Sequence, residues 1–255
     1  MTHELFDITG KKAIVTGAAQ NLGKGIAEGL LEAGASVVII DIAKCLDDTV
    51  AEFREKGYDA YGVSANIMNE SERTGAFEKS LELLGGRIDI LVNSAGVQRI
   101  VPPEDFPLED WHRVIEINLV AMFHFCQLSG RVMLKQGEGK IINIASLLSF
   151  FGGIDVSAYA ASKGGVAQLT SSLSNSWSRK GINVNAIAPG YMNTTLNKEL
   201  LEDEATNKMI SNRIPKGRWG TPQDLKGLVI FLSSKASDYI CGDIIKVDGG
   251  YYNAG

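Results

Sequence analysis

Cysteine and histidine are scarce in this 255-residue chain, and neither occurs in a pattern that holds a metal. The cysteines are widely separated and odd in number, which fits neither a disulfide framework nor a Cys-x-x-Cys site, so we expect reduced thiols in a cytoplasmic protein. They are Cys45, Cys126 and Cys241. The histidines have no metal-ligand spacing, so no metal site is predicted. They are His3, His112 and His124.

A strong net charge is also missing, because 25 basic and 30 acidic residues leave only −5 at pH 7. No basic field is present to hold nucleic acid, so a nucleic-acid partner is not expected. The opening stretch, MTHELFDITGKK, contains acidic side chains and no apolar signal region, and no uninterrupted apolar run is long enough to span a membrane. We therefore expect no membrane partner and a small molecule as the ligand.

What the chain does have is a regular alternation of short apolar runs and longer helical patterns. Seven runs are expected to be strands: KAIVTG, SVVIID, DAYGVSA, IDILVNSAG, KIINIAS, INVNAIAPG and DIIKVDGG. Helices are expected between them, at residues 22–34, 46–57, 70–85, 108–136, 157–180 and 221–234. This order predicts a single α/β domain over residues 1–255, a Rossmann-type doubly wound parallel sheet of about seven strands with helices on both faces. The polar stretch at 191–216 falls outside the alternation and is predicted to be a substrate lid.

A glycine-rich turn, TGAAQNLGKG at 16–25, follows the first expected strand and enters a helix. Such a turn points backbone N–H groups and the positive end of the helix at a phosphate. Neither the Walker A pattern nor the GxGxxG fingerprint fits, and Asn21 stands where a third glycine is expected. Asparagine tolerates the left-handed backbone region, so the turn can still form. An ordinary glycine turn without a ligand is the alternative.

Asp41 ends the second expected strand, where a carboxylate can bind the hydroxyls of an adenosine ribose. A 2′-phosphate would meet like charge there, so NAD is favoured over NADP. Lys44, close by in the sequence, would favour NADP instead. A role for Asp41 as the cap of the next helix is the alternative.

Tyr159 and Lys163 lie four residues apart in SAYAASKGG, which places both on one helix face. The spacing alone is weak evidence, because it also arises by chance. Other motifs occur with it in a fixed order: TGx3NxG at 16–23, NSAG at 93–96, Asn118, Ser146 and PG at 189–190. Together they resemble the short-chain dehydrogenase/reductase family over nearly the whole chain.

The resemblance implies a dinucleotide-binding catalytic domain, oxidation of CH–OH groups with NAD, and a homotetramer that pairs the helices at 108–136 and 157–180. It implies a catalytic tetrad of Asn118, Ser146, Tyr159 and Lys163. With the residues argued above, the predicted cofactor-binding set is Gly17, Asn21, Leu22, Gly23, Asp41, Ile42, Asn66, Ile67, Asn93, Ala95, Gly96, Tyr159, Lys163, Pro189, Gly190, Met192 and Thr194. The chain departs from the family pattern at Asn21, at Ser94 in the usual NNAG, and at Asn66, where an aspartate facing adenine is common.

Each tetrad member has a task in the oxidation of a secondary alcohol. Tyr159 is the base for the hydroxyl proton, and the Lys163 ammonium is expected to lower the tyrosine pKa from its usual value near 10. By resemblance, Lys163 also binds the nicotinamide ribose. Ser146 can hydrogen-bond the reacting oxygen, and Asn118 would hold a relay water. Taken singly, the serine could be a strand-end cap, the asparagine a helix-bending hydrogen bonder and the lysine a solvated side chain.

The carboxyl half resembles the sugar-acid branch of the family, through KIINIASLLSFFGGI, NVNAIAPGYMNT and RIPKGRWGTPQDL. This branch implies 2-dehydro-3-deoxy-D-gluconate as the substrate, with gluconate as the alternative. Besides Ser146 and Tyr159, substrate binding needs a counter-charge for the carboxylate, for which Arg99 and Arg213 are the candidates. Surface ion pairs are the alternative for both arginines. Two other functions stay open: reduction of a 3-oxoacyl thioester, and a catalytically silent dinucleotide-binding sensor.

Overall fold

The computed structural model describes residues 4–254, so His3 and the outermost ends of the predicted 1–255 domain lie outside the described residues. Within this range, seven parallel strands form one sheet in the order β3-β2-β1-β4-β5-β6-β7. The strands are β1 Lys12–Thr16, β2 Ser36–Asp41, β3 Ala60–Ser64, β4 Ile90–Asn93, β5 Gly139–Ile144, β6 Ile182–Pro189 and β7 Ile244–Val247. The strand order reverses between β1 and β4. The predicted doubly wound parallel sheet is confirmed.

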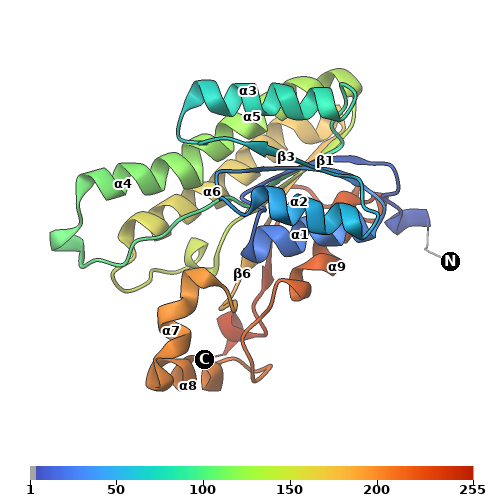
Figure 1. Ribbon diagram of the computed structural model, residues 1–255. Coiled ribbons are helices and arrows are strands. Elements are labelled where there is room, and N and C mark those ends of the chain that lie inside the picture. The colour runs from blue at the N-terminus through green and yellow to red at the C-terminus, as the bar shows by residue number, and fades with distance from the viewer. Residues whose placement is uncertain (1–3, 255) are drawn as a thin grey trace.

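Helices cover both faces of this sheet (Figure 1). One face carries α1 (Asn21–Glu32), α2 (Leu46–Glu55) and α9 (Gln223–Ser233), and the other carries α3 (Glu70–Leu83), α5 (Met122–Gln136) and α6 (Ser157–Trp177). Leu30 of α1 and Phe125 of α5 are fully buried, one against each face. Because both faces are covered, the inner strands have almost no solvent side, and every residue of β6 is buried. The edge strands β3 and β7 contain exposed and partly exposed residues.

α4 (Leu108–Ile115), a π-helical segment (Glu116–Ala121) and α5 form one continuous helical stretch. By length and composition alone, its 29 residues are apolar enough to cross a membrane. The polar side chains of His112 and Asn118 interrupt the stretch, so the sequence shows no uninterrupted apolar run. Half of its most apolar window is buried inside the protein, as in a helix that covers the sheet of an α/β domain.

The segment 191–216 stands apart from the sheet, below the main body in Figure 1, and carries α7 (Lys198–Glu202) and α8 (Glu204–Arg213). The sequence predicts neither helix, because both are short, polar and without a clear apolar stripe. The Asp203 side chain begins α8 by accepting a backbone hydrogen bond at 2.7 Å. An apolar cluster joins the segment to the body; its buried members are Leu147, Ile210, Ile214, Trp219 and Tyr251.

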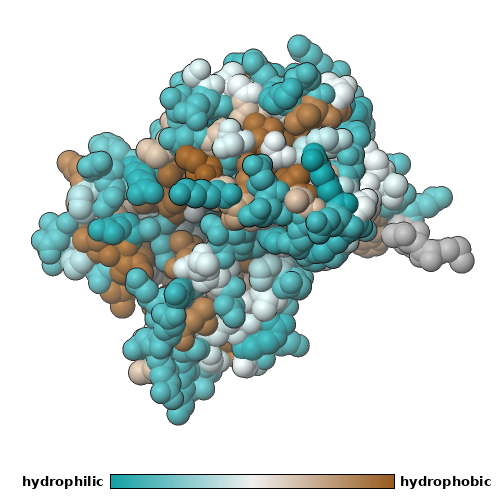
Figure 2. Space-filling view, in the orientation of Figure 1, coloured by the Kyte–Doolittle hydropathy of each residue, from teal (hydrophilic) through white to brown (hydrophobic). Residues whose placement is uncertain are grey.

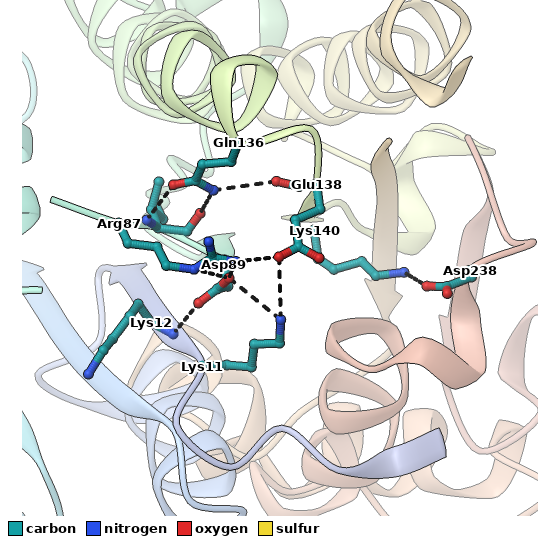
Figure 3. Close-up of polar contacts among 9 residues, drawn as sticks. Lys11, Lys12, Arg87, Asp89, Gln136, Glu138, Lys140 and Asp238 are labelled. Carbon is teal, nitrogen blue, oxygen red and sulfur yellow. Dashed lines mark hydrogen bonds and ion pairs between the residues drawn. The ribbon is translucent and has the colours of Figure 1, made fainter. Parts of the chain in front are cut away.

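A polar network joins the amino-terminal ends of β1, β4 and β5 (Figure 3). At its centre Asp89, which is 5% exposed, accepts hydrogen bonds from the Lys12 N–H at 2.8 Å and from the Arg87 guanidinium at 2.6 and 2.8 Å. Arg87 also pairs with Glu138, and the Lys11 ammonium lies 3.6 Å from the Asp89 carboxylate. The network therefore holds together the amino-terminal ends of β1, β4 and β5, at the edge of the sheet opposite the carboxyl ends of the strands.

Candidate active site

A cleft of about 660 Å³ opens at the carboxyl ends of the strands, beside the reversal between β1 and β4. Ligands of doubly wound sheets bind at this position, and the volume lies within the range of ligand sites. Most residues of the predicted cofactor set line the cleft: Gly17, Asn21, Leu22, Gly23, Asp41, Ile42, Asn66, Ile67, Ala95, Gly96, Tyr159, Lys163 and Thr194. The structure thus brings together residues from widely separated motifs.

The glycine-rich turn forms the wall of the cleft between β1 and α1. Gly17 has φ +65°, and a Cβ on it would lie 2.5 Å from the Cα of Ala95, so no side chain fits there. A Cβ on Gly23 would overlap the carbonyl of Gly17. Asn21 takes the left-handed conformation at φ +54°, which asparagine tolerates, and α1 begins at this residue, one position before the predicted start. The turn therefore leaves room for a phosphate to approach the backbone and the amino end of α1.

Asp41 lines the cleft and also holds its wall together. One carboxylate oxygen accepts a hydrogen bond from the Ala19 N–H and the other accepts one from the Ala43 N–H, each at 2.9 Å. The remaining lone pairs can accept hydrogen bonds from hydroxyl groups in the cleft. Asp41 does not cap α2, which begins at Leu46. Lys44 is exposed and lies outside the lining of the cleft.

Tyr159 and Lys163 lie one turn apart on α6, and both line the cleft. Lys163 is 4% exposed, and its Nζ donates to the Ile144 carbonyl at 2.6 Å and lies 5.6 Å from the centre of the Tyr159 ring. Ser146, just beyond β5, lies close enough to Tyr159 for its hydroxyl to affect the tyrosine pKa. Ser146 itself is outside the lining of the cleft, and its Oγ accepts a hydrogen bond from the Leu148 N–H at 3.1 Å. The structure therefore brings three members of the predicted tetrad into one group.

Burial sets the pKa values of the tyrosine and the lysine. It lowers the pKa of Lys163 to about 8. It raises the pKa of Tyr159, and the nearby Ser146 hydroxyl opposes part of that rise. The direction for Tyr159 is opposite to the one expected from the sequence, because burial raises the tyrosine pKa. The Lys163 ammonium donates its hydrogen bond to the Ile144 carbonyl. Helical spacing alone does not show which oxygen the ammonium faces.

Asn118, the fourth member of the tetrad, is buried in the π-helical segment and fixes the loop that follows β4. Its Oδ1 accepts from the Val97 N–H and its Nδ2 donates to the Val97 carbonyl, both at 2.9 Å. Nδ2 also donates to Ser162 Oγ at 3.0 Å. This pairing holds Gly96 beside both Asn118 and Lys163, where a Cβ would lie 3.4 and 3.7 Å from their polar atoms.

Four residues of the predicted cofactor set do not line the cleft: Asn93, Pro189, Gly190 and Met192. Asn93 is 4% exposed, and its Nδ2 donates to Asn143 Oδ1 at 2.9 Å, which joins β4 to β5. Met192 is 3% exposed and packs in the core on the α1 face of the sheet.

Comparison with known proteins agrees with this geometry. Residues 17–252 match a family model described as enoyl-(acyl carrier protein) reductase. The chain is also 46% identical over 250 residues to the 2-dehydro-3-deoxy-D-gluconate 5-dehydrogenase of Bacillus subtilis (strain 168), covering 98% of this chain and 97% of that protein. The chain belongs to the short-chain dehydrogenase/reductase family.

Other members of the family carry names that refer to sugar acids. The gluconate 5-dehydrogenase of Gluconobacter oxydans (strain 621H) is 36% identical over 255 residues, with 98% of each chain covered. A solved gluconate 5-dehydrogenase from Burkholderia cenocepacia J2315, in complex with NADP and tartrate, superposes with a TM-score of 0.94 at 38% identity and covers 99% of both chains. These relatives confirm the family predicted from the order of the motifs.

Neither arginine selected from the sequence for a sugar carboxylate lines the cleft of this family member. The Arg99 side chain is 58% exposed, and its Nε lies 3.2 Å from Asp110 Oδ2. Arg213, on α8, donates to the Tyr251 hydroxyl at 3.0 Å, and its guanidinium lies 4.4 Å from the centre of that ring. In this structure both side chains are occupied by partners within the chain.

The lining residues that sequence reasoning missed include Arg113 on α4 and Ile117 in the π-helical segment. They lie four residues apart, so they share a helix face. Ile117 directly precedes Asn118 in the sequence. That adjacency is the signal from which the sequence could have predicted that this helix face lies at the site. Arg113 is thus an exposed basic residue in the lining of the cleft, and its guanidinium is suited to anionic groups of a cofactor or substrate.

Proposed function

We propose that the protein is an NAD-dependent oxidoreductase that transfers a hydride between nicotinamide and a secondary hydroxyl or ketone of a sugar acid. The first proposed substrate is 2-dehydro-3-deoxy-D-gluconate, and gluconate is the alternative. The observation that carries the proposal is that Tyr159 and Lys163, with Ser146 close to the tyrosine, line a cleft whose glycine-rich wall suits a dinucleotide. The names of the relatives from Bacillus subtilis and Gluconobacter oxydans support the substrate class.

In this proposal Tyr159 takes the proton from the substrate hydroxyl, and Ser146 stabilises the charge that develops on the same oxygen. The bound nicotinamide would supply the hydride acceptor. Burial raises the pKa of Tyr159, and in the proposed mechanism the Lys163 ammonium, whose Nζ lies 5.6 Å from the ring centre, opposes that rise as the proton moves. Asn118 keeps the loop that carries Gly96 in place beside Lys163, and its predicted relay water remains part of the proposal.

The preference for NAD over NADP rests on Asp41. Its carboxylate is fixed by two backbone N–H groups at the end of β2, where an added 2′-phosphate would meet negative charge. The relative from Burkholderia cenocepacia was solved with NADP, so the family fold itself accepts the phosphorylated cofactor. The local charge at position 41 is therefore the feature from which we infer NAD.

A sugar carboxylate needs a counter-charge, and three arginines are proposed. Arg113 lines the cleft, whereas Arg99 and Arg213 would first have to leave Asp110 and Tyr251. We propose that the segment 191–216 acts as the lid over this substrate. No nucleic-acid or membrane partner is proposed.

A cytoplasmic homotetramer is part of the proposal. Exposed apolar side chains on the stretch 108–136, including Leu108 and Phe123, support subunit contacts there. Figure 2 shows brown apolar patches at the left of this face, around α4.

The proposal is tested by following NADH or NADPH absorbance with purified protein. The panel contains 2-dehydro-3-deoxy-D-gluconate and gluconate with NAD or NADP, and a 3-oxoacyl thioester with the reduced cofactors. We expect turnover of a hexonate with NAD, and loss of that turnover in Ser146→Ala. Reduction of the thioester alone would replace the sugar-acid assignment, and cofactor binding without any turnover would support a sensor.

A further inference from the structure

The segment 191–216 is tied to both walls of the cleft by side chains that the proposed chemistry does not use. On one wall, Asn21 makes two hydrogen bonds to Thr195: its Nδ2 donates to Thr195 Oγ1 at 2.8 Å, and its Oδ1 accepts from the Thr195 N–H at 3.1 Å. On the other wall, Gln98 Nε2 donates to the Leu196 carbonyl at 3.2 Å. Thr195 and Leu196 themselves line the cleft. Two adjacent residues thus bridge its walls.

Asn21 belongs to the glycine-rich turn and also makes the hydrogen bonds that connect this turn to Thr195. Its backbone is left-handed at φ +54°, a conformation that glycine adopts freely and asparagine adopts with modest strain. A glycine would form the same turn but would have no amide to reach Thr195, 174 positions further along the chain. The three hydrogen bonds are exposed, so each one alone contributes little free energy. Their combined effect is to hold the adjacent residues Thr195 and Leu196 against the two walls of the cleft.

We propose that Asn21 is a positioning residue that clasps Thr195 over the cleft and thereby slows the entry and release of the cofactor. The cleft keeps about 660 Å³ beneath the clasped segment, so the clasp and a bound ligand can coexist. Release requires Thr195 and Leu196 to leave both walls, which breaks all three hydrogen bonds. The inference rests on the proposed function, because it takes the ligand of the cleft to be a nicotinamide dinucleotide.

The clasp is tested first on the free protein, by backbone hydrogen exchange in residues 193–197. Asn21→Gly keeps the left-handed turn and removes the clasp, so exchange should become roughly five-fold faster or more, as for the loss of one or two exposed hydrogen bonds. Asn21→Asp keeps two oxygens that can accept from the Thr195 N–H and hydroxyl, and it should restore slow exchange. Lys198→Ala is the matched control. It breaks an ion pair between Lys198 and Glu202, which both belong to the segment, and leaves the hydrogen bonds to the cleft walls intact, so exchange should match the wild type.

Cofactor release is then measured by stopped-flow NADH fluorescence. In Asn21→Gly, NADH should leave roughly five-fold faster, and the KM for NAD should rise by a larger factor than any change in kcat, because the released contact lies at the cofactor and not at the reacting atoms. The proposal would be overturned if residues 193–197 exchanged as slowly in Asn21→Gly as in the wild type. It would also be overturned if they exchanged faster while the rate of NADH release stayed the same. If the wild-type protein bound no NADH, the proposed function would fail, whereas the exchange data would still decide whether Asn21 holds Thr195.

Discussion

Replacing Lys163 with methionine should stabilise the protein at pH 7 while removing its activity. Lys163 is 4% exposed, and burial lowers its pKa from 10.5 to about 8. That difference corresponds to about 3 kcal/mol of unfavourable free energy for the buried ammonium. Methionine carries no charge, but it leaves the Ile144 carbonyl without its hydrogen bond from Nζ, which costs about 1–3 kcal/mol. We therefore expect Lys163→Met to be more stable by about 0–2 kcal/mol at pH 7.

The pH dependence of this difference has a definite sign. Between pH 8 and 10.5 the unfolded chain binds more protons at Lys163 than the folded protein does, so the unfolding free energy of the wild type rises with pH relative to the variant. The advantage of Lys163→Met should fall by about 3 kcal/mol across that window. Urea unfolding followed by tryptophan fluorescence at several pH values, at a fixed protein concentration, measures the difference. Parallel pH curves for the two proteins would refute the reasoning.

Three further substitutions test other parts of the account. Asp41→Asn should raise kcat/KM with NADP relative to NAD by about ten-fold, because a like charge near the 2′-phosphate is removed; an unchanged ratio in steady-state assays would count against Asp41 as the discriminating residue. Arg99→Ala should raise the KM for a hexonate much more than the KM for NAD, and equal effects on both would refute Arg99 as the carboxylate ligand. Asp89→Asn should lower the unfolding free energy by about 2–3 kcal/mol without changing kcat, since the Asp89 network lies at the edge of the sheet away from the cleft; wild-type stability in urea would show that it does not hold the strands.

All seven strands could be located from the sequence because a parallel sheet covered on both faces requires short apolar runs bounded by polar turns. The strand β2, found as SVVIID, is the clearest example, with every residue before Asp41 buried. The helices α7 and α8 could not be found in the same way. Short polar helices depend on tertiary contacts, here the cluster around Trp219 and Tyr251, and a local pattern does not contain that information.

The candidate site was likewise predictable from the sequence only in part. Gly17 and Asp41 could be placed at the cleft because the βα units of a doubly wound fold fix where the strands end. Side-chain direction could not be read in this way: Asn93 turns inward to a neighbouring strand, whereas Arg113 turns toward the cleft. The pKa direction of Tyr159 also follows from burial, which residue spacing does not reveal.

The most direct test of the central claim, that the Tyr159 hydroxyl is the base at the cofactor cleft, is to measure NADH binding and turnover together in Tyr159→Phe. Phenylalanine keeps the ring against Lys163 and removes only the hydroxyl. The account predicts that the Kd for NADH changes by less than about five-fold, while kcat for oxidation of 2-dehydro-3-deoxy-D-gluconate falls by about 10²–10⁴. A Tyr159→Phe protein that binds NADH and keeps more than about a tenth of the wild-type kcat would contradict it.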